Sequence, residues 1–382
     1  MHVLIPALHR PIKPTGVCRH AANLAQSLAE CDQVDQVTLL IGQWQESYFE
    51  ELFPHISPKI QLVKIAIKNR SLDRNRWFMF GLPKLSRQLK PDIIHMSFPF
   101  PFVRAWFTAP IISTIHDLYP YECPENFGYP RVWFNQSFLK QCIKNSDGLS
   151  CVSQCTLDAL EHYFPGTQKR QRAKVIYNTV DFTETASRRP SSLAAQHTQA
   201  FLLTVAQHRK NKNLDLLIQA YSSLQKEQQL KPETTLLIVG SSGPETERLK
   251  QLVDSLQLNK LVLFLSGLDD PELRWLYEQA LAFVIPSSTE GFCLPLVEAL
   301  ALSCPVVCSD IPIFREVGLD LCTYFPLGDF PLGERAVRAL SAAITTSLTT
   351  ERIKTSSICQ KFSRHSLAQD LLSFYSEVLQ PN

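Results

Sequence analysis

The segment 281-LAFVIPSSTEGFCLPLVEAL-300 decides how this chain folds. Its first six residues form a short apolar run ending at Pro286, which is typical of a buried parallel strand. Residues 296–302 predict the first turns of a helix, with Glu298 as its one charge, and a polar loop carrying Glu290 lies between. We therefore expect the strand–loop–helix order of α/β proteins, whose ligands bind outside the carboxyl ends of the strands.

The two carboxylates of this segment restrict its ligand. A carboxylate repels phosphate but accepts hydrogen bonds from hydroxyl groups, so Glu290 and Glu298 suit a ligand that carries hydroxyls. The backbone N–H groups of Phe292, Cys293 and Leu294 lie where the predicted helix begins, and helix N-termini stabilise anions. The segment thus fits a ligand with both hydroxyls and phosphate, of which a sugar nucleotide is the simplest.

The same segment resembles the E-x7-E motif of the family-4 (group 1) retaining glycosyltransferases, which have the GT-B fold. The family pattern E-G-F-G-x-P-x-x-E-A-x-A is matched by EGFCLPLVEALA at 290–301, and PVVCSD follows at 305–310. Cys293 stands where glycine is usual; if the backbone approaches the donor closely there, the thiol narrows the space and changes donor preference. The resemblance implies an α/β protein of two Rossmann-like domains whose parallel sheets face each other across a cleft.

Length and composition agree with two ordinary domains. The chain has 382 residues, of which 45% are apolar and 19% charged, and its formal charge of +2 is too small to argue for nucleic-acid binding. Eleven cysteines without a secretory leader do not suggest a disulfide framework. No apolar run approaches the ~18 residues of a membrane helix. We expect a cytoplasmic protein, soluble or peripheral on the cytoplasmic membrane face.

We expect four regions along the chain. The resemblance implies an N-terminal, acceptor-side Rossmann-like domain at 1–183 and a C-terminal nucleotide-sugar-binding domain at 200–361, with a polar linker at 184–199 between them. The linker contains SRRPSS and lacks a periodic apolar pattern. The tail 362–382 has apolar residues near helical spacing, and the resemblance implies that this last helix crosses back to the first domain.

A loop after the first predicted strand leads into a helix predicted from Ala21. Gly16 lies at its turn, a ligand-binding layout in α/β domains. The segment resembles a G-x-x-R stretch of the family that lies near donor phosphate and acceptor, which implies a donor-binding role for Gly16 and for Arg19. A tight turn followed by an exposed arginine is the alternative.

Two histidines end predicted strands of the first domain. His95 follows the run at 91–94, and it belongs either to the scaffold or to the ligand site. The residues TIHD at 114–117 resemble the T-x-H-D segment of the family. That resemblance implies that His116 lies beside the transferred sugar, with its backbone carbonyl facing the reacting carbon.

A basic loop, QHRKNKN at 207–213, separates a predicted strand at 201–205 from a predicted helix. Cations next to a helix terminus suit phosphate. The loop resembles the R-K-N-L element that grips the donor diphosphate, and Lys212 matches its lysine. Asn211 replaces the arginine, so Arg209 is the expected substitute, with Lys210 as a competitor. A solvated loop is the simpler alternative.

The stretch 64–90 is rich in Lys and Arg and contains Trp77, Phe78 and Phe80. A basic amphipathic helix with aromatic residues can lie on an anionic membrane, which predicts a peripheral contact with the inner membrane surface. In the alternative, the aromatic side chains pack on the sheet and the charges are solvated.

The resemblance implies transfer of a hexose-type sugar from a nucleotide-diphosphate sugar to an acceptor hydroxyl, in polysaccharide, glycolipid or other glycan synthesis. The acceptor would be a saccharide or a lipid-linked molecule. No D-x-D motif is present, which fits metal-independent, cofactor-free chemistry with Arg209, Lys212 and helix N–H groups on the diphosphate. Glu298 would bind the ribose, and Glu290 and His116 would serve the transferred sugar. The alternatives are a non-catalytic GT-B sugar-nucleotide-binding protein and a hydride-transfer enzyme, which would lack its glycine fingerprint here.

Overall fold

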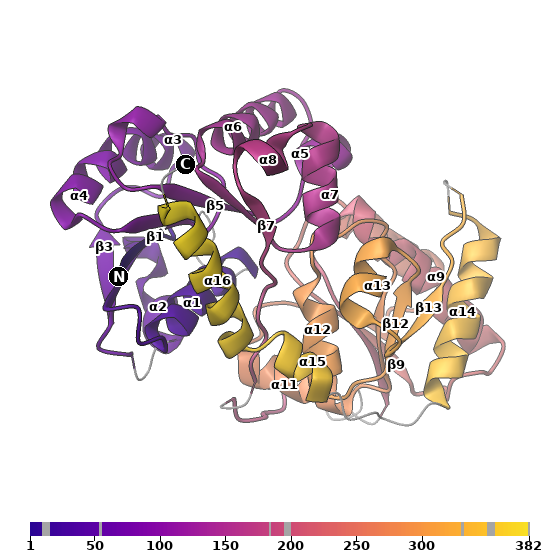
Figure 1. Cartoon of the computed structure of the whole chain (residues 1–382). Helices are drawn as coiled ribbons and strands as arrows, with labels where there is room; N and C mark the ends of the chain where they lie inside the picture. Colours follow the sequence, from indigo (N-terminus) through magenta and orange to yellow (C-terminus); the bar gives the residue numbers. More distant parts are fainter. Residues whose placement is uncertain are drawn as a thin grey trace. The chain divides into compact units, whose positions relative to one another are not determined.

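The computed structural model folds into two compact units (Figure 1). Unit 1 comprises Met1–Thr179 together with Phe362–Asn382, and unit 2 comprises Val180–Lys361. Residues 185–194, within the expected linker, form no helix or strand. The structure describes residues 1–9, 16–52, 56–182, 185–194, 200–329, 332–349 and 356–380.

Unit 1 is built on a seven-stranded parallel sheet in the order β3-β2-β1-β4-β5-β6-β7. The chain adds strands on one side of β1 and then returns to add the rest on the other side, so the order reverses between β1 and β4. Loops at such a reversal point lie next to each other and commonly hold the ligand. The strands are β1 His2–Pro6, β2 Gln36–Gly42, β3 Ile60–Ile65, β4 Ile93–Met96, β5 Ile111–Ile115, β6 Gly148–Cys151 and β7 Ala173–Val175.

Two helical layers cover this sheet (Figure 1). Apolar side chains of α1, α2 and α16 share one core cluster with β1 and β2, whereas side chains of η2, α4 and α6 form a second cluster that includes Leu4 and Ile94. The helices of unit 1 are α1 Gly16–Ala29, η1 Gln43–Gln45, α2 Glu46–Leu52, α3 Ser71–Arg76, η2 Trp77–Gly81, α4 Leu82–Leu89, η3 Arg104–Trp106, α5 Tyr119–Glu122, η4 Pro124–Asn126, α6 Arg131–Asn145, α7 Gln154–Tyr163, α8 Thr167–Arg170 and α16 Arg364–Leu379.

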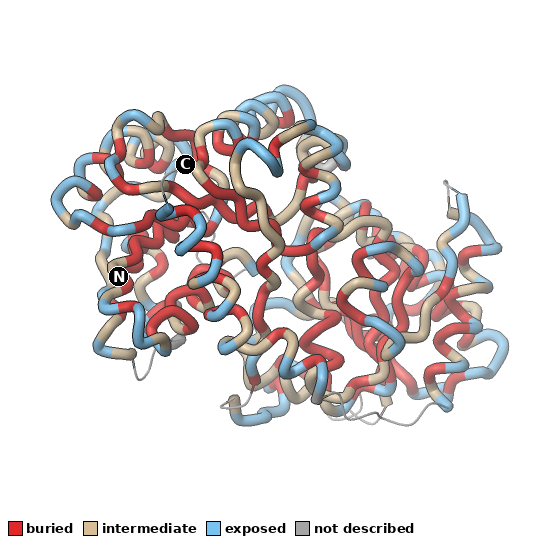
Figure 2. The backbone as a smooth tube through the Cα atoms, viewed as in Figure 1, coloured by how far each residue is buried: buried red, intermediate tan, exposed pale blue. Residues whose placement is uncertain are grey.

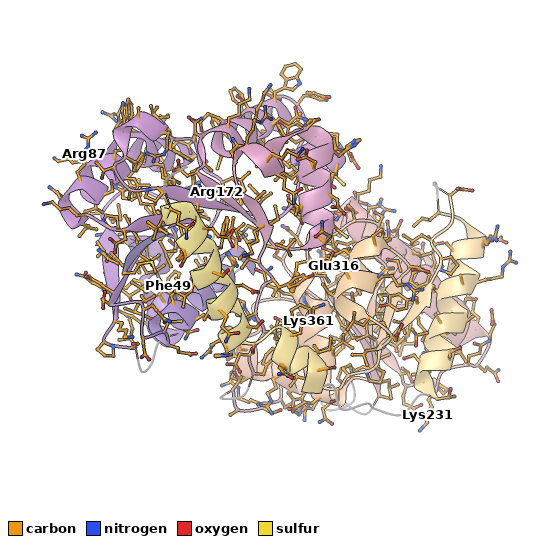
Figure 3. The ribbon with its side chains drawn as sticks, viewed as in Figure 1. Phe49, Arg87, Arg172, Lys231, Glu316 and Lys361 are labelled. Atoms are coloured by element: carbon orange, nitrogen blue, oxygen red, sulfur yellow. The ribbon has the colours of Figure 1, made fainter. Side chains whose placement is uncertain are left out.

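The terminal helix α16 packs tightly into unit 1. Gly148 makes the approach possible, because a Cβ there would lie 2.9 Å from the ring of Phe374. Beyond the end of the helix, Arg172 Nη2 donates to the backbone oxygen of Gln380 at 3.2 Å (Figure 3). At the other end, Thr179 Oγ1 donates to the backbone oxygen of Phe362 at 2.7 Å. Both ends of the returning segment are therefore tied to unit 1 by hydrogen bonds.

Unit 2 repeats the architecture with six parallel strands in the order β10-β9-β8-β11-β12-β13, and its reversal point lies between β8 and β11. Its strands are β8 Phe201–Val205, β9 Thr235–Val239, β10 Val262–Leu265, β11 Ala282–Ile285, β12 Val306–Ser309 and β13 Cys322–Phe325. Its helices are η6 Lys210–Lys212, α9 Leu214–Lys226, α10 Thr246–Ser255, α11 Asp270–Gln279, α12 Leu294–Ala301, α13 Pro312–Gly318, α14 Glu334–Leu348 and α15 Ser356–Lys361. Near the end of α15, Lys361 Nζ reaches the backbone oxygen of Glu316 at 3.3 Å (Figure 3).

Most residues of the central strands of both sheets are buried (Figure 2). This burial explains why they are continuous apolar runs instead of alternating patterns. The α/β prediction with two Rossmann-like units is thereby confirmed. Two helix boundaries differ from the prediction: the helix predicted from Ala21 begins at Gly16, which places Arg19 and His20 on its first turns, and the helix predicted from residue 296 begins at Leu294.

The aromatic residues of the stretch 64–90 divide between the two interpretations offered above. Phe78 is buried and stacks on Phe100 with ring centroids 3.6 Å apart, and Trp77 is half-buried. Phe80 is 61% exposed. The packing interpretation therefore holds for Phe78 and Trp77 but is wrong for Phe80.

Candidate functional site

Two loops meet at the reversal point of unit 2. Because β8 and β11 are parallel neighbours, the loops leaving their carboxyl ends run side by side. Asn213 Nδ2 donates to the backbone oxygen of Pro286 at 2.8 Å, and Asn211 Nδ2 donates to that of Thr289 at 3.1 Å. In return, the backbone N–H of Ser288 donates to the oxygen of Asn211 at 2.9 Å. The basic loop and the loop of Glu290 are thus held as one body.

These contacts give Asn211 a role of its own. Asn211 is 5% exposed, and its side-chain amide donates to the backbone of the loop that carries Glu290. At this position the family pattern has an arginine that binds the donor diphosphate. In this chain, Asn211 instead joins the two loops by a buried hydrogen bond. Arg209 is half-buried and Lys210 is exposed, and within the described ranges neither forms a salt bridge.

Lys212 and Glu290, both predicted site residues, are in direct contact. Lys212 Nζ lies 2.6 Å from Glu290 Oε1, and their side chains are 14% and 8% exposed. Ser287 Oγ donates to the same oxygen at 2.8 Å. When two opposite charges are nearly buried, each offsets the desolvation penalty of the other. Removing one partner would leave the other buried without compensation.

Glu298 lies on the second turn of α12 and is 6% exposed. The hydroxyl of Tyr277, from α11, donates to its Oε2 at 2.9 Å. Sequence reasoning missed Tyr277 because a tyrosine on the buried face of an amphipathic helix carries no local mark of a polar partner. Ser287, two residues after β11, was missed because nothing in the sequence indicates that its hydroxyl donates to Glu290.

The structure supplies a backbone reason for the usual glycine at position 293. Cys293 is the N-cap residue of α12 and has φ 71° and ψ 71°, a left-handed conformation that glycine adopts without steric cost. The residue is 8% exposed, and burial raises the pKa of its thiol well above the ordinary value. Cys293 is therefore a neutral, strained residue at the start of the helix whose N–H groups were predicted to hold an anion.

His208 joins the basic loop to the start of α10. Its Nδ1 lies 2.8 Å from Thr246 Oγ1, and the residue is 3% exposed. A Cβ at Gly243 would lie 2.3 Å from the backbone oxygen of His208, so only glycine fits there. Burial lowers the pKa of His208, which therefore holds loops together as a neutral ring.

In unit 1 the reversal point gathers histidines. His116 Nε2 lies 2.9 Å from the backbone oxygen of Ser97, which follows β4. A carbonyl oxygen only accepts, so Nε2 carries the proton and Nδ1 is an acceptor. Burial lowers the pKa of His116 to about 4, so the ring is neutral at pH 7. His20 packs edge-on against it, with ring centroids 4.7 Å apart.

His95 belongs to the scaffold. It is fully buried; its Nδ1 lies 2.6 Å from the hydroxyl of Tyr375, and its Nε2 lies 2.8 Å from Thr114 Oγ1. The same threonine oxygen lies 3.2 Å from Nε2 of His20. A hydrogen-bonded chain thus runs from α16 through β4 and β5 to α1, where His20 contacts His116.

Gly16 is exposed at the first position of α1, and residues 10–15 of its predicted loop lie outside the described ranges. Arg19 is half-buried. Among the residues that the structure describes, no group of three or more His, Cys, Asp or Glu side chains could hold a metal ion. Over the same residues, no helix has the length and apolar character needed to cross a membrane.

Comparison with protein families decides the class of the molecule. Residues 14–184 match the model described as Glycosyltransferase Family 4, and residues 187–321 match the model described as Glycosyl transferases group 1. The chain belongs to this glycosyltransferase family. Its two units are accordingly the two Rossmann-like domains of the GT-B fold.

The chain is similar to several named glycosyltransferases. The O-antigen chain mannosyltransferase RfbU of Salmonella typhimurium is 26% identical over 79% of this chain and 80% of its own length. A Campylobacter jejuni N-acetylgalactosamine-N,N'-diacetylbacillosaminyl-diphospho-undecaprenol 4-alpha-N-acetylgalactosaminyltransferase is 32% identical over 46% of this chain and 45% of its own length. The pneumococcal O-GlcNAc transferase GtfA, solved with UDP and GlcNAc, shares the fold with a TM-score of 0.71 and 14% identity over 100% of this chain and 99% of that one.

Proposed function

We propose that this glycosyltransferase moves a hexose-type sugar from a nucleotide-diphosphate sugar to a hydroxyl of a saccharide or lipid-linked acceptor, in the synthesis of O-antigen or another cell-envelope polysaccharide. The observation that carries the proposal is the contact of Lys212 with Glu290 at the reversal point of unit 2. There a cation, a carboxylate and the start of α12 come together on hydrogen-bonded loops. The names of the O-antigen and diphospho-undecaprenol relatives support the acceptor class.

Each site residue then has a task that its chemistry allows. Lys212 binds the donor diphosphate, aided by Arg209 and by the backbone N–H groups at 292–294. Glu290 accepts hydrogen bonds from hydroxyls of the transferred sugar, and Glu298 accepts them from the ribose. Glu298 comes to this task already oriented by the hydroxyl of Tyr277.

Because Lys212 contacts Glu290, binding of the donor would replace this ion pair by a contact of Lys212 with the diphosphate. Without donor, the ammonium is neutralised by the carboxylate. With donor, the diphosphate competes for the ammonium, and Glu290 is released toward the sugar hydroxyls. A single displacement of Nζ therefore couples recognition of the phosphate to recognition of the sugar.

In the proposed retaining reaction, the acceptor hydroxyl attacks the anomeric carbon on the face that the diphosphate leaves. The bond between that carbon and the phosphate oxygen breaks, and the leaving phosphate takes the hydroxyl proton. Lys212, Arg209 and the N-terminus of α12 stabilise the charge that develops on the diphosphate. His116, neutral and with Nδ1 as an acceptor, holds a sugar hydroxyl. The chain's own cations perform this stabilisation, so we propose metal-independent catalysis without a cofactor.

Donor binding and turnover measured on the same variants test the assignment. A panel of UDP-, GDP- and ADP-sugars is screened by thermal shift, because ligand binding raises the apparent melting temperature. Glu298→Ala is expected to weaken donor binding, and Glu290→Ala is expected to lower kcat more than it weakens binding. Glu247→Ala, whose side chain is 79% exposed, is the control. Near-control kinetics in both site variants would refute the assignment, and tight binding without turnover would favour a non-catalytic sugar-nucleotide-binding protein.

We further propose a cytoplasmic protein that contacts the inner membrane surface peripherally. A lipid-linked acceptor of the kind named in the Campylobacter relative resides in a bilayer. An enzyme that uses such an acceptor gains from staying at the membrane surface.

A further inference from the structure

One helical layer of unit 1 turns its outer side to solvent as a single surface. Phe78 of η2, Leu82 of α4 and Cys142 of α6 belong to the same core cluster on one face of the sheet. The outer sides of these helices therefore face the same way, and Figure 1 shows α3, α4 and α6 along that side of the sheet. The segment between β4 and β5 links α4 to α6. Arg87 Nη2 of α4 donates to the backbone oxygen of Trp106 at 3.1 Å, and Gln141 Oε1 of α6 accepts from the backbone N–H of Phe102 at 3.0 Å.

The outer side of α3, η2 and α4 mixes apolar and basic side chains. Leu72 is 79% exposed and Phe80 is 61% exposed, with exposed Arg76, Lys84 and Arg87 around them. Arg87 extends outward from α4 (Figure 3). Residues 68–90 contain seven Lys or Arg and one Asp. Apolar side chains on this side are therefore surrounded almost entirely by cations.

The N-terminal end of α6 repeats the mixture. Tyr129, Trp133 and Phe134 are 74%, 64% and 61% exposed, and the rings of Tyr129 and Trp133 lie edge-on at 5.2 Å. Exposed Lys140 and Lys144 lie seven and eleven residues beyond Trp133, on the same side of the helix. No acidic residue occurs in 128–146.

The opposite layer of unit 1 has the reverse charge. Helix α2 carries Glu46 and Glu50, and α16 carries Asp370 and Glu377 with one cation, Arg364. Its core cluster lies on the other face of the sheet. Among the described residues of unit 1, the aromatic side chains that are more than 60% exposed all lie on the side of α3, η2, α4 and α6.

From this arrangement we propose that the aromatic–basic face, comprising Leu72, Arg76, Phe80, Lys84, Arg87, Tyr129, Trp133, Phe134, Lys140 and Lys144, docks on the surface of an anionic lipid bilayer. Single exposed apolar residues are ordinary, but five that are more than 60% exposed on one layer mark an interaction surface. Tryptophan and tyrosine favour the depth of the lipid headgroups. Lys and Arg at that depth are attracted to anionic phosphates.

The distribution of charge favours a bilayer over the other polyanions. Proteins that bind nucleic acids are strongly basic and carry a basic groove or stripe. This chain has a net charge of only +2, and the cations of this face alternate with apolar side chains. The proposal rests on the lipid-linked acceptor proposed above, since docking would bring the enzyme to the plane in which that acceptor lies.

Vesicle binding by the full chain tests the proposal without any substrate. The protein is co-sedimented with vesicles of phosphatidylcholine and phosphatidylglycerol at 3:1, and with pure phosphatidylcholine. We expect binding to the anionic vesicles that weakens as salt is raised. Phe80→Ser combined with Trp133→Ser is expected to weaken binding at least tenfold, as is Arg76→Gln combined with Lys140→Gln and Lys144→Gln.

Matched controls come from elsewhere on the chain. Leu379→Ser changes an exposed apolar residue of α16, and Lys226→Gln with Lys231→Gln and Lys260→Gln removes three exposed cations of unit 2 (Lys231, Figure 3). Both controls should bind vesicles like the parent protein. No binding to anionic vesicles, or equal losses in test and control variants, would overturn the proposal, as would binding to RNA or to an acidic protein in place of vesicles.

A second readout separates this proposal from the proposed function. Hydrolysis of the donor sugar in water should be the same in the parent protein and in the face variants, because none of the altered residues belongs to the donor site. Normal hydrolysis with no vesicle binding would refute the surface alone. Vesicle binding with no turnover of any donor would refute the proposed function alone.

Discussion

Unit 1 should lose stability when the pH falls from 7 to 5.5, because of its buried histidines. His9, His20 and His95 are all buried, at 4%, 2% and 0% exposure. Burial lowers the pKa of His9 and of His95 to about 3 and lowers that of His20 well below the ordinary value. In the unfolded chain the same side chains have a pKa of about 6.5.

The sign and size of the effect follow from proton linkage. Below pH 6.5 the histidines bind protons in the unfolded chain but not in the folded chain. Their contribution to the free energy of unfolding is therefore fully present above pH 6.5 and is lost as the pH falls toward 3. Each histidine contributes on the order of 1 kcal/mol per pH unit. His116, whose pKa burial lowers to about 4, behaves in the same way, so the four histidines together remove about 5 kcal/mol by pH 5.5, a large share of the ~5–15 kcal/mol that a domain has. Glu122 and Asp370, whose pKa values burial raises, act weakly in the opposite direction.

Tryptophan fluorescence can follow unit 1 selectively, because four of the five tryptophans lie there, at positions 44, 77, 106 and 133. Urea unfolding is measured at pH 7.5, 6.5 and 5.5, and the free energy of unfolding is plotted against pH. His9→Gln should flatten the acid side of that plot by about one proton. His162→Gln, which changes an exposed histidine of α7, should leave the slope unchanged. A free energy that is constant or rises between pH 6.5 and 5.5 would show that these rings are not held neutral.

Substitutions at three positions probe two hydrogen bonds and one backbone conformation. Tyr375→Phe removes the hydroxyl that pairs with His95 and should cost unit 1 about 1–2 kcal/mol in urea unfolding; an unchanged midpoint would mean the 2.6 Å contact contributes nothing. Asn211→Ala breaks the tie to the backbone of Thr289, so it should both lower the melting temperature of unit 2 and weaken donor binding, and loss of stability with normal binding would contradict the link between loops. Cys293→Val forces a β-branched side chain into a left-handed backbone and should destabilise unit 2 by about 1–3 kcal/mol, whereas Cys293→Gly should be tolerated better, an order that calorimetry can check.

The strands could be predicted because they are buried on both faces. Phe201–Val205 was expected and found with the same bounds, since five apolar or β-favouring residues in a row leave few alternatives. The predicted start of α1 was five residues too late. Gly16, Val17 and Cys18 were predicted to be loop residues, because the sequence does not show the contacts that stabilise the start of this helix. Phe80 could have been placed correctly, because it lies two residues from both Phe78 and Leu82, and residues two apart on a helix face opposite sides.

Glu290, Glu298 and Lys212 were each found by motif, but the contact between Lys212 and Glu290 and the contribution of Tyr277 were not predicted. The pattern at 290–301 singles out Glu290 and Glu298, yet nothing near either residue in the sequence indicates Lys212 or Tyr277. Those pairings depend on which strands are neighbours, and a parallel sheet joins segments that are distant along the chain. His116 is similar, because its tautomer is set by a carbonyl on the loop after β4.

The two reversal points explain why polar residues with such different tasks accumulate where they do. Between β8 and β11, and again between β1 and β4, the chain leaves neighbouring strands toward opposite sides of the sheet, so backbone groups at the carboxyl ends lack ladder partners. In unit 2 asparagine side chains, and in unit 1 serine and histidine side chains, satisfy those groups. Loops fixed in this way hold Lys212 against Glu290. If Lys212 binds the donor diphosphate as we propose, the buried asparagines should matter to donor affinity as much as the charges they support.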